Sequence, residues 1–89
     1  MEKYLVVVES GPTNFSAYSP DVSGCAATGK TIDKTVASFR TALAFHFQGI
    51  EEDGDELPTP KGLRYWLDSG EISDADILAF VEVNIPALA

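Results

Sequence analysis

The fold is decided by one amphipathic stretch, residues 31–53, which reads TIDKTVASFRTALAFHFQGIEED. Thr31 is a good N-cap residue, and Asp33 stands in the first turn, where the helix dipole favours an acid. Apolar residues then recur at steps of four, three, four, four and three, which places them on one stripe of an α-helix. We therefore predict a helix that begins after Thr31 and ends within residues 49–53. The predicted stripe consists of Ile32, Val36, Phe39, Leu43, Phe47 and Ile50.

Three short strands are predicted ahead of this helix. Residues 4–9 read YLVVVE, an apolar run rich in β-branched valine that ends in an acid. Residues 15–19 alternate apolar and polar side chains, and residues 25–28 are small. Residues 10–14 and 20–24 carry the glycine, proline and asparagine typical of turns. The three strands are therefore expected to form an antiparallel meander.

The segment that follows the helix is expected to be extended, then helical, then a strand. Residues 57–60 read LPTP, and proline disfavours helix in the residue before it. A short helix is predicted at residues 63–69, with Gly70 as its C-cap. Residues 77–85 predict the last strand, and its apolar residues on both faces favour a central position in the sheet. One face would carry Ile77, Ala79, Val81, Val83 and Ile85, and the other Leu78 and Phe80.

Together these elements predict an α+β protein, a two-layer sandwich of order β-β-β-α-β with a short extra helix before the last strand. The length of 89 residues suits one domain, and we expect residues 1–89 to form it. Hydrophobic residues make up 45% of the chain, which supports a core without disulfide bonds or a structural metal. With one cysteine, no signal-peptide pattern and no apolar run of membrane-spanning length, the sequence predicts a soluble cytoplasmic protein.

The formal net charge of −8 restricts the choice of partners. An acidic surface repels nucleic-acid phosphates, so direct nucleic-acid binding is not expected. It suits a basic protein partner, because complementary charge speeds encounter and rejects wrong partners. A second interpretation, that the acids only keep the protein soluble, stays open from composition alone.

The sequence contains few candidate catalytic or metal-binding residues. Cys25 and His46 are the only pair of nucleophile and base, and Cys25 has no basic neighbour in the sequence, whereas reactive thiols need one. One cysteine and one histidine cannot form a zinc site within one chain. The acidic run of residues 51–56 lacks the ligand spacing of a calcium loop, and no glycine-rich phosphate loop is present. We therefore expect neither catalysis nor a cofactor or metal.

One helix face looks like a contact surface. The side opposite the apolar stripe bears a single charge, Lys34, and carries small residues such as Ser38 around the aromatic Phe45. Whether Phe45 is exposed there or covered by residues 63–69 is left open. Trp66 likewise has two interpretations, an internal core residue or a partner anchor. The tentative partner-binding set is Ser38, Phe45, Glu51, Glu52, Asp53 and Trp66.

The ordered motifs resemble those of the HicB antitoxin family. Residues 18–32 read YSPDVSGCAATGKTI, in which a strand ends in Pro-Asp and is followed by Gly-Cys, a short strand, Gly-x-Thr and an amphipathic helix. The Leu-Pro-x-Pro run at residues 57–60, the first strand and the strand near the C-terminus are also similar to that family. The resemblance assigns shaping roles in the backbone to Pro20, Gly24, Cys25, Gly29, Thr31, Pro58 and Pro60.

The resemblance implies a partial ribonuclease H fold without a working active site. It further implies a protein that binds and blocks a small basic toxin of the HicA type, an mRNA-cleaving ribonuclease, and that associates with itself. The DNA-binding domain of many family members is not expected, since the residues after Pro60 are few and acidic. Two alternatives remain: a regulatory or structural homo-oligomer without a toxin partner, and a ribonuclease H-like nuclease. For the nuclease the first strand offers only Glu9 as a metal ligand.

Overall fold

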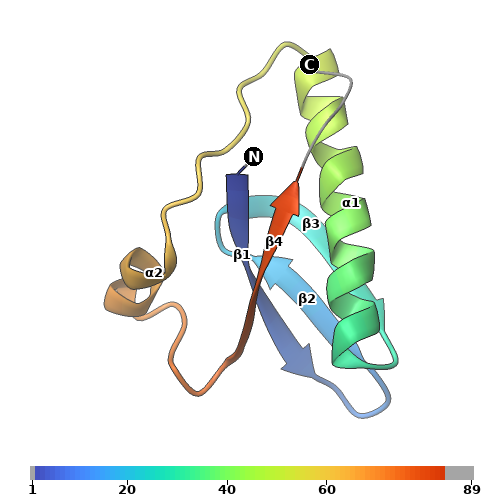
Figure 1. The fold of residues 1–89 in the computed structure, drawn as a ribbon, viewed down its shortest axis with the longest axis vertical. Helices are drawn as coiled ribbons and strands as arrows, with labels where there is room; N and C mark the ends of the chain where they lie inside the picture. The colour runs from blue at the N-terminus through green and yellow to red at the C-terminus, as the bar shows by residue number, and fades with distance from the viewer. Residues whose placement is uncertain (1, 84–89) are drawn as a thin grey trace.

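The computed structural model describes residues 2–83, which form a four-stranded antiparallel sheet with a helix against each face (Figure 1). The sheet order is β3-β2-β1-β4. The predicted α+β order, with a short helix before the last strand, is confirmed. In chain order the elements are β1 (Glu2–Ser10), β2 (Phe15–Ser19), β3 (Val22–Gly29), α1 (Ile32–Glu52), α2 (Leu63–Ser69) and β4 (Ile77–Val83).

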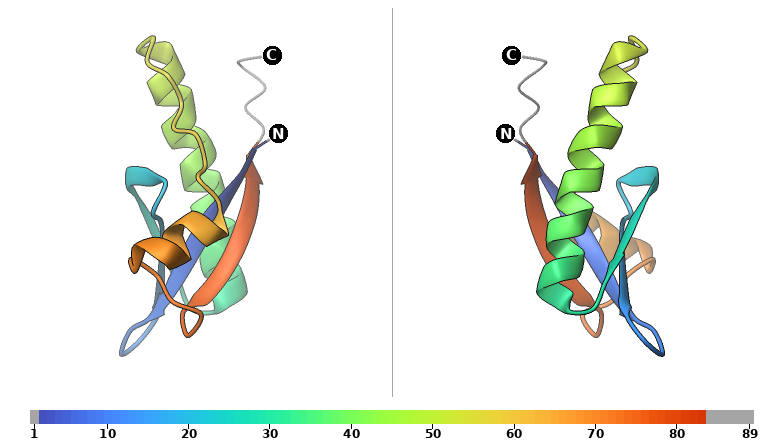
Figure 2. Two further views of the ribbon diagram at one scale, coloured as in Figure 1. Left: turned by 90° about the vertical axis from the view of Figure 1, so that its left-hand side faces the viewer. Right: turned by 90° about the vertical axis from the view of Figure 1, so that its right-hand side faces the viewer.

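β1 is a central strand, and its apolar run explains why. The side chains of residues 4–8 are all buried, because α1 packs against one face of the sheet and α2 against the other. The two side views in Figure 2 show the sheet between the two helices. β1 also extends beyond its predicted bounds, since Glu2 pairs with Val83 and Ser10 with Phe15.

The prediction that the last strand is central was wrong, because β4 pairs with β1 alone and forms one edge of the sheet. Its two apolar faces have another cause. Ala79, Val81 and Val83 face the core under α1, while Leu78 packs against the α2 side. Apolar residues on both faces of a strand therefore indicate that helices cover both faces of the sheet. They do not indicate that the strand has a neighbouring strand on each side. The predicted last residue of this strand, Ile85, lies outside the described residues.

β3 begins earlier than predicted. The turn between β2 and β3 comprises only Pro20 and Asp21, and Val22 to Gly24, predicted as loop, already belong to the strand. The register between β2 and β3 shifts at Tyr18/Ser19, which leaves β3 with extra residues at this point. Gly24 has a φ of +79° there, a conformation that residues with a side chain rarely adopt. The irregularity disrupts regular pairing along β3, which forms the second edge of the sheet.

α1 follows the predicted stripe except at its first residue. The Thr31 hydroxyl accepts a hydrogen bond from the Lys34 N–H at 3.1 Å, which confirms the N-cap. Phe39, Leu43 and Phe47 are buried as predicted. Ile32, however, is exposed, and Thr35 is fully buried in its place. The Thr35 hydroxyl donates to the Thr31 carbonyl at 2.7 Å, so its burial leaves no unsatisfied polar group.

The close approach of α1 to the end of β3 predicts a strong effect of a single methyl group. A Cβ added at Gly29 would lie 2.7 Å from Thr35 Oγ1 and 2.9 Å from the Thr35 backbone nitrogen. Gly29→Ala is therefore expected to lower the free energy of unfolding by about 2 kcal/mol. The matched control is Gly49→Ala. A Cβ added at Gly49 has no neighbouring atom within 4 Å, so this substitution should stabilise α1 by about 0.5–1 kcal/mol. Urea titration of both variants tests this, and equal stabilities would contradict it.

α2 and the segment before it cover the second sheet face. Leu63, Trp66 and Leu67 pack with buried Leu5 and Val7. Gly70 adopts the left-handed conformation as the predicted C-cap. Asp21 holds this segment to the β2–β3 turn, because its Oδ1 accepts hydrogen bonds of 2.9 Å from Trp66 Nε1 and from the Lys61 N–H. The predicted extended run of residues 57–60 is also tied down, since the Tyr4 hydroxyl donates to the Pro58 carbonyl at 2.6 Å.

Candidate partner-binding site

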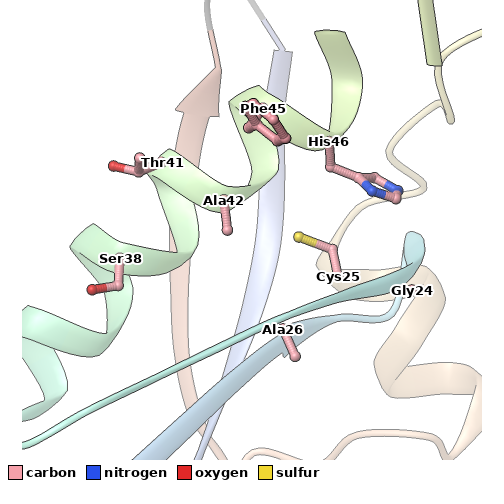
Figure 3. Close-up of a pocket in the computed structure, with 8 residues that line it drawn as sticks. All are labelled: Gly24, Cys25, Ala26, Ser38, Thr41, Ala42, Phe45 and His46. Atoms are coloured by element: carbon pink, nitrogen blue, oxygen red, sulfur yellow. The ribbon is translucent and has the colours of Figure 1, made fainter. Parts of the chain in front are cut away.

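A groove of about 620 Å³ lies between α1 and the edge strand β3 (Figure 3). It exists because both elements present small residues where they meet, so no side chain fills the space. Phe45 stands at the groove and is 77% exposed, so α2 does not cover it. Of the two interpretations of Phe45, the structure selects the exposed one. The groove is lined by Gly24, Cys25, Ala26, Ser38, Thr41, Ala42, Phe45 and His46.

Cys25 and His46 share this groove although they are far apart in the sequence. Burial raises the pKa of the Cys25 thiol, which holds it in the protonated, poorly nucleophilic form at neutral pH. No hydrogen bond joins Cys25 Sγ to His46 among the contacts of the described residues. The His46 ring instead lies near the Phe47 ring, at 6.4 Å between centroids. Cys25 therefore lacks the lowered pKa that is typical of reactive thiols, and both side chains line the groove.

The predicted acids lie at the end of the helix that bears Phe45. Glu51 and Glu52 are the last two residues of α1, Asp53 is its C-cap, and all three are exposed. The C-terminal end of a helix is its negative end, where acids are unfavourable and bases are preferred, yet the last turn of α1 contains no basic residue. These acids therefore do not serve the stability of the helix, and their exposure leaves them available to a cation.

Trp66 is placed apart from the other predicted partner-binding residues. It lies on α2, across the sheet from α1, is partly buried against Leu5 and Val7, and donates its indole N–H to Asp21. The neighbouring Tyr65 is more exposed and packs edge-on against the Trp66 ring, with centroids 4.9 Å apart. The structure thus favours the core interpretation of Trp66, while Ser38 and Phe45 come together in the groove.

The strand half of the groove was missed at the sequence level. From the sequence, Gly24 and Cys25 were assigned to the shaping of the backbone, Ala26 was given no role, and His46 was considered only as a possible base for Cys25. Helical periodicity groups residues on one helix but does not say which strand lies beside them. The absence of any bulky side chain in residues 23–29 was the available signal.

Glu9, the possible nuclease ligand, is exposed near the end of β1. Across residues 2–83, no three His, Cys, Asp or Glu side chains lie close enough together to hold a metal ion. No helix in this part of the chain combines the length and the apolar character needed to span a membrane.

Three comparisons bear on the whole chain. One curated relative is an uncharacterized 14.9 kDa protein from the rep-hol intergenic region of Haemophilus phage HP1 (strain HP1c1), 28% identical over 85 residues. The match covers 96% of this chain and 63% of that protein, so this chain spans less than two thirds of its relative.

Solved structures share the fold. One chain of the HicA3 and HicB3 toxin-antitoxin complex aligns with a TM-score of 0.74 and 27% identity, covering 92% of this chain and 98% of that one. The N-terminal domain of the Burkholderia pseudomallei antitoxin HicB aligns with a TM-score of 0.79 and 21% identity, covering 92% of this chain and 98% of the other.

The sequence model of one family matches nearly the whole chain. It describes the HicB-like antitoxin of bacterial toxin-antitoxin systems, and it matches residues 4–89. The chain therefore belongs to the HicB-like antitoxin family.

Proposed function

We propose that this chain is an antitoxin that binds a small basic toxin of the HicA type and thereby prevents it from cleaving RNA. The likeness to a chain of the HicA3 and HicB3 complex carries this proposal, because it extends over 92% of this chain and 98% of that one at 27% identity. Membership of the antitoxin family supports the same role. In this proposal residues 1–89 act as one binding domain in the cytoplasm, where the RNA substrate of the toxin is found.

Electrostatics supports a basic partner. The net charge of −8 attracts a cationic protein over a distance of about 10 Å at moderate salt, and it repels RNA. Inhibition in this mechanism is steric, because the bound antitoxin occupies the surface that RNA would approach. No bond is made or broken by the antitoxin. Its acids accelerate encounter and disfavour neutral or acidic proteins as partners.

The binding test begins by asking whether an open reading frame adjacent to the gene of this chain encodes a small basic protein that contains histidine. That protein is then produced as an inactive variant in which the histidine is replaced. Isothermal titration and stopped-flow mixing should show a stable complex whose association rate falls steeply as salt rises from 50 to about 500 mM. Bovine serum albumin, an acidic protein, serves as the control for non-specific binding. The proposal is wrong if no such complex forms, or if the chain only associates with itself.

A further inference from the structure

The α1–β3 groove joins an apolar pocket to an exposed aromatic wall. Single exposed apolar side chains are common on protein surfaces and by themselves mean little. Phe45 differs in its setting, since it borders a cavity of about 620 Å³ whose other wall is formed by Gly24, Cys25 and Ala26. Figure 3 shows these residues on the strand below the helix. Such a cavity can receive a side chain that then contacts the Phe45 ring on one side and the strand backbone on the other.

The same helix face carries negative charge beyond the groove. Glu52 lies seven residues after Phe45, which is about two turns or 10 Å along the same face of α1. Glu51 and Asp53 flank it, and none of the three forms a salt bridge with a basic residue of the described chain. A partner lying along α1 would therefore meet an apolar pocket first and an anionic end two turns later.

We propose that the α1–β3 groove is the docking surface for the basic toxin. An apolar side chain of the toxin enters the cavity beside Phe45, and a lysine or arginine of the toxin contacts Glu52. This inference rests on the proposed function and assigns a location to it. A second copy of this chain is disfavoured as the occupant, because it would bring another charge of −8 against the same acids.

The test measures the affinity of the full chain for the inactive toxin described above. Phe45→Ala is expected to raise the dissociation constant about 30-fold, which is the effect of losing a central aromatic contact. The matched control is Phe80→Ala, which removes another exposed phenylalanine, 48% accessible, from the edge strand β4. The control should change the dissociation constant by less than about threefold. Both variants remove exposed side chains, and unchanged melting temperatures would confirm that each remains folded.

Charge reversal tests the acidic end of the groove. Glu52→Lys should weaken binding about tenfold at low salt and progressively less as salt rises, because the contact is exposed and screened. Asp74→Lys makes the same change at an exposed position in the turn before β4 and should have a smaller effect. Equal effects of the two variants would show that only net charge matters, and would contradict docking at the groove.

The single cysteine gives a second measurement that needs no substitution. Cys25 lines the groove, so bound toxin should slow its alkylation by N-ethylmaleimide at least about tenfold, as followed by mass spectrometry of this chain. If the toxin binds the unmodified chain while Phe45→Ala and the alkylation rate of Cys25 show no effect, the groove is not the docking surface and the antitoxin role still stands. If Phe45→Ala instead dissociates a homodimer, a second copy occupies the groove. If the toxin does not bind at all, the proposed function itself fails.

Discussion

Phe39→Ala is expected to lower the free energy of unfolding by about 4 kcal/mol, the typical loss for a fully buried phenylalanine. Phe39 is 0% exposed at the middle of α1 and belongs to the cluster that includes Val6, Leu43 and Val81. A domain of 89 residues has a total stability on the order of 4–13 kcal/mol, so this loss removes much of it. Chemical denaturation followed by circular dichroism measures the difference.

The same substitution six residues later on the same helix provides the control. Phe45→Ala should change stability by less than about 0.5 kcal/mol, because Phe45 is exposed and loses no internal contacts. If Phe39→Ala proves unfolded, Phe39→Leu retains most of the buried surface and should cost about 1–1.5 kcal/mol. Similar losses for Phe39→Ala and Phe45→Ala would mean that α1 presents a different face to the sheet.

Asp21→Ala is expected to cost about 2–3 kcal/mol and to loosen α2 from the sheet. The substitution leaves Trp66 Nε1 and the Lys61 N–H without their acceptor, and each of these bonds to a carboxylate stabilises by about 1.5–3 kcal/mol when formed. Detachment of the segment lets both groups bind water, which limits the total loss. Trp66 is the only tryptophan, so a red shift of its fluorescence before global unfolding reports this detachment.

The control for this contact is Asp21→Asn, whose amide oxygen can still accept both hydrogen bonds. The asparagine variant loses the negative charge and replaces Oδ2 by an amide NH2 group. In the wild-type chain Oδ2 is buried without a hydrogen-bond partner within residues 2–83. We expect a loss of stability of about 1 kcal/mol, no more than half that of the alanine variant. An alanine variant as stable as the asparagine variant, with unchanged Trp66 fluorescence, would show that Asp21 does not hold α2.

Local patterns in the sequence predicted the elements that depend on local physics. The spacing from Val36 to Phe47 predicted α1 and its buried face, and Thr31 predicted where the helix begins. The small residues of β3 and the proline-containing turn before it predicted an antiparallel meander, although the strand starts three residues earlier than expected. In each case the deciding interaction joins residues within a few positions of one another.

These local patterns did not predict how elements far apart in the sequence are arranged in space. The position of β4 depends on its pairing with β1, whose residues lie 69 to 81 positions earlier in the sequence, and apolar periodicity contains no information about which edge of the sheet β4 occupies. Thr35 replaces Ile32 in the core because α1 approaches β3 at Gly29, a contact between elements. The hydrogen bond from Trp66 to Asp21 spans 45 positions and ties α2 to the second sheet face.

The candidate site shows the same division. Ser38 and Phe45 were identified from the helix alone, because a helix face with a single charge, Lys34, is visible in the sequence of an otherwise acidic chain. The strand side of the groove and the place of His46 in it depend on the packing of β3 beside α1, which the helix sequence alone does not specify. The acids at the C-terminal end of α1 are unfavourable for the helix itself because of the helix dipole. This is the reason to consider them as a contact for a basic partner.

The central claim, that this acidic domain neutralises a basic ribonuclease without chemistry of its own, is tested most directly by titrating it into an RNA cleavage assay. The active toxin is mixed with a fluorescent RNA, and the cleavage rate is measured as the chain is added with Mg²⁺ present. We expect cleavage to fall linearly to background at a fixed molar ratio, and the chain alone to cleave no RNA. Cleavage that continues unchanged at saturating chain, or Mg²⁺-dependent cleavage by the chain alone that Glu9→Gln abolishes, would contradict it.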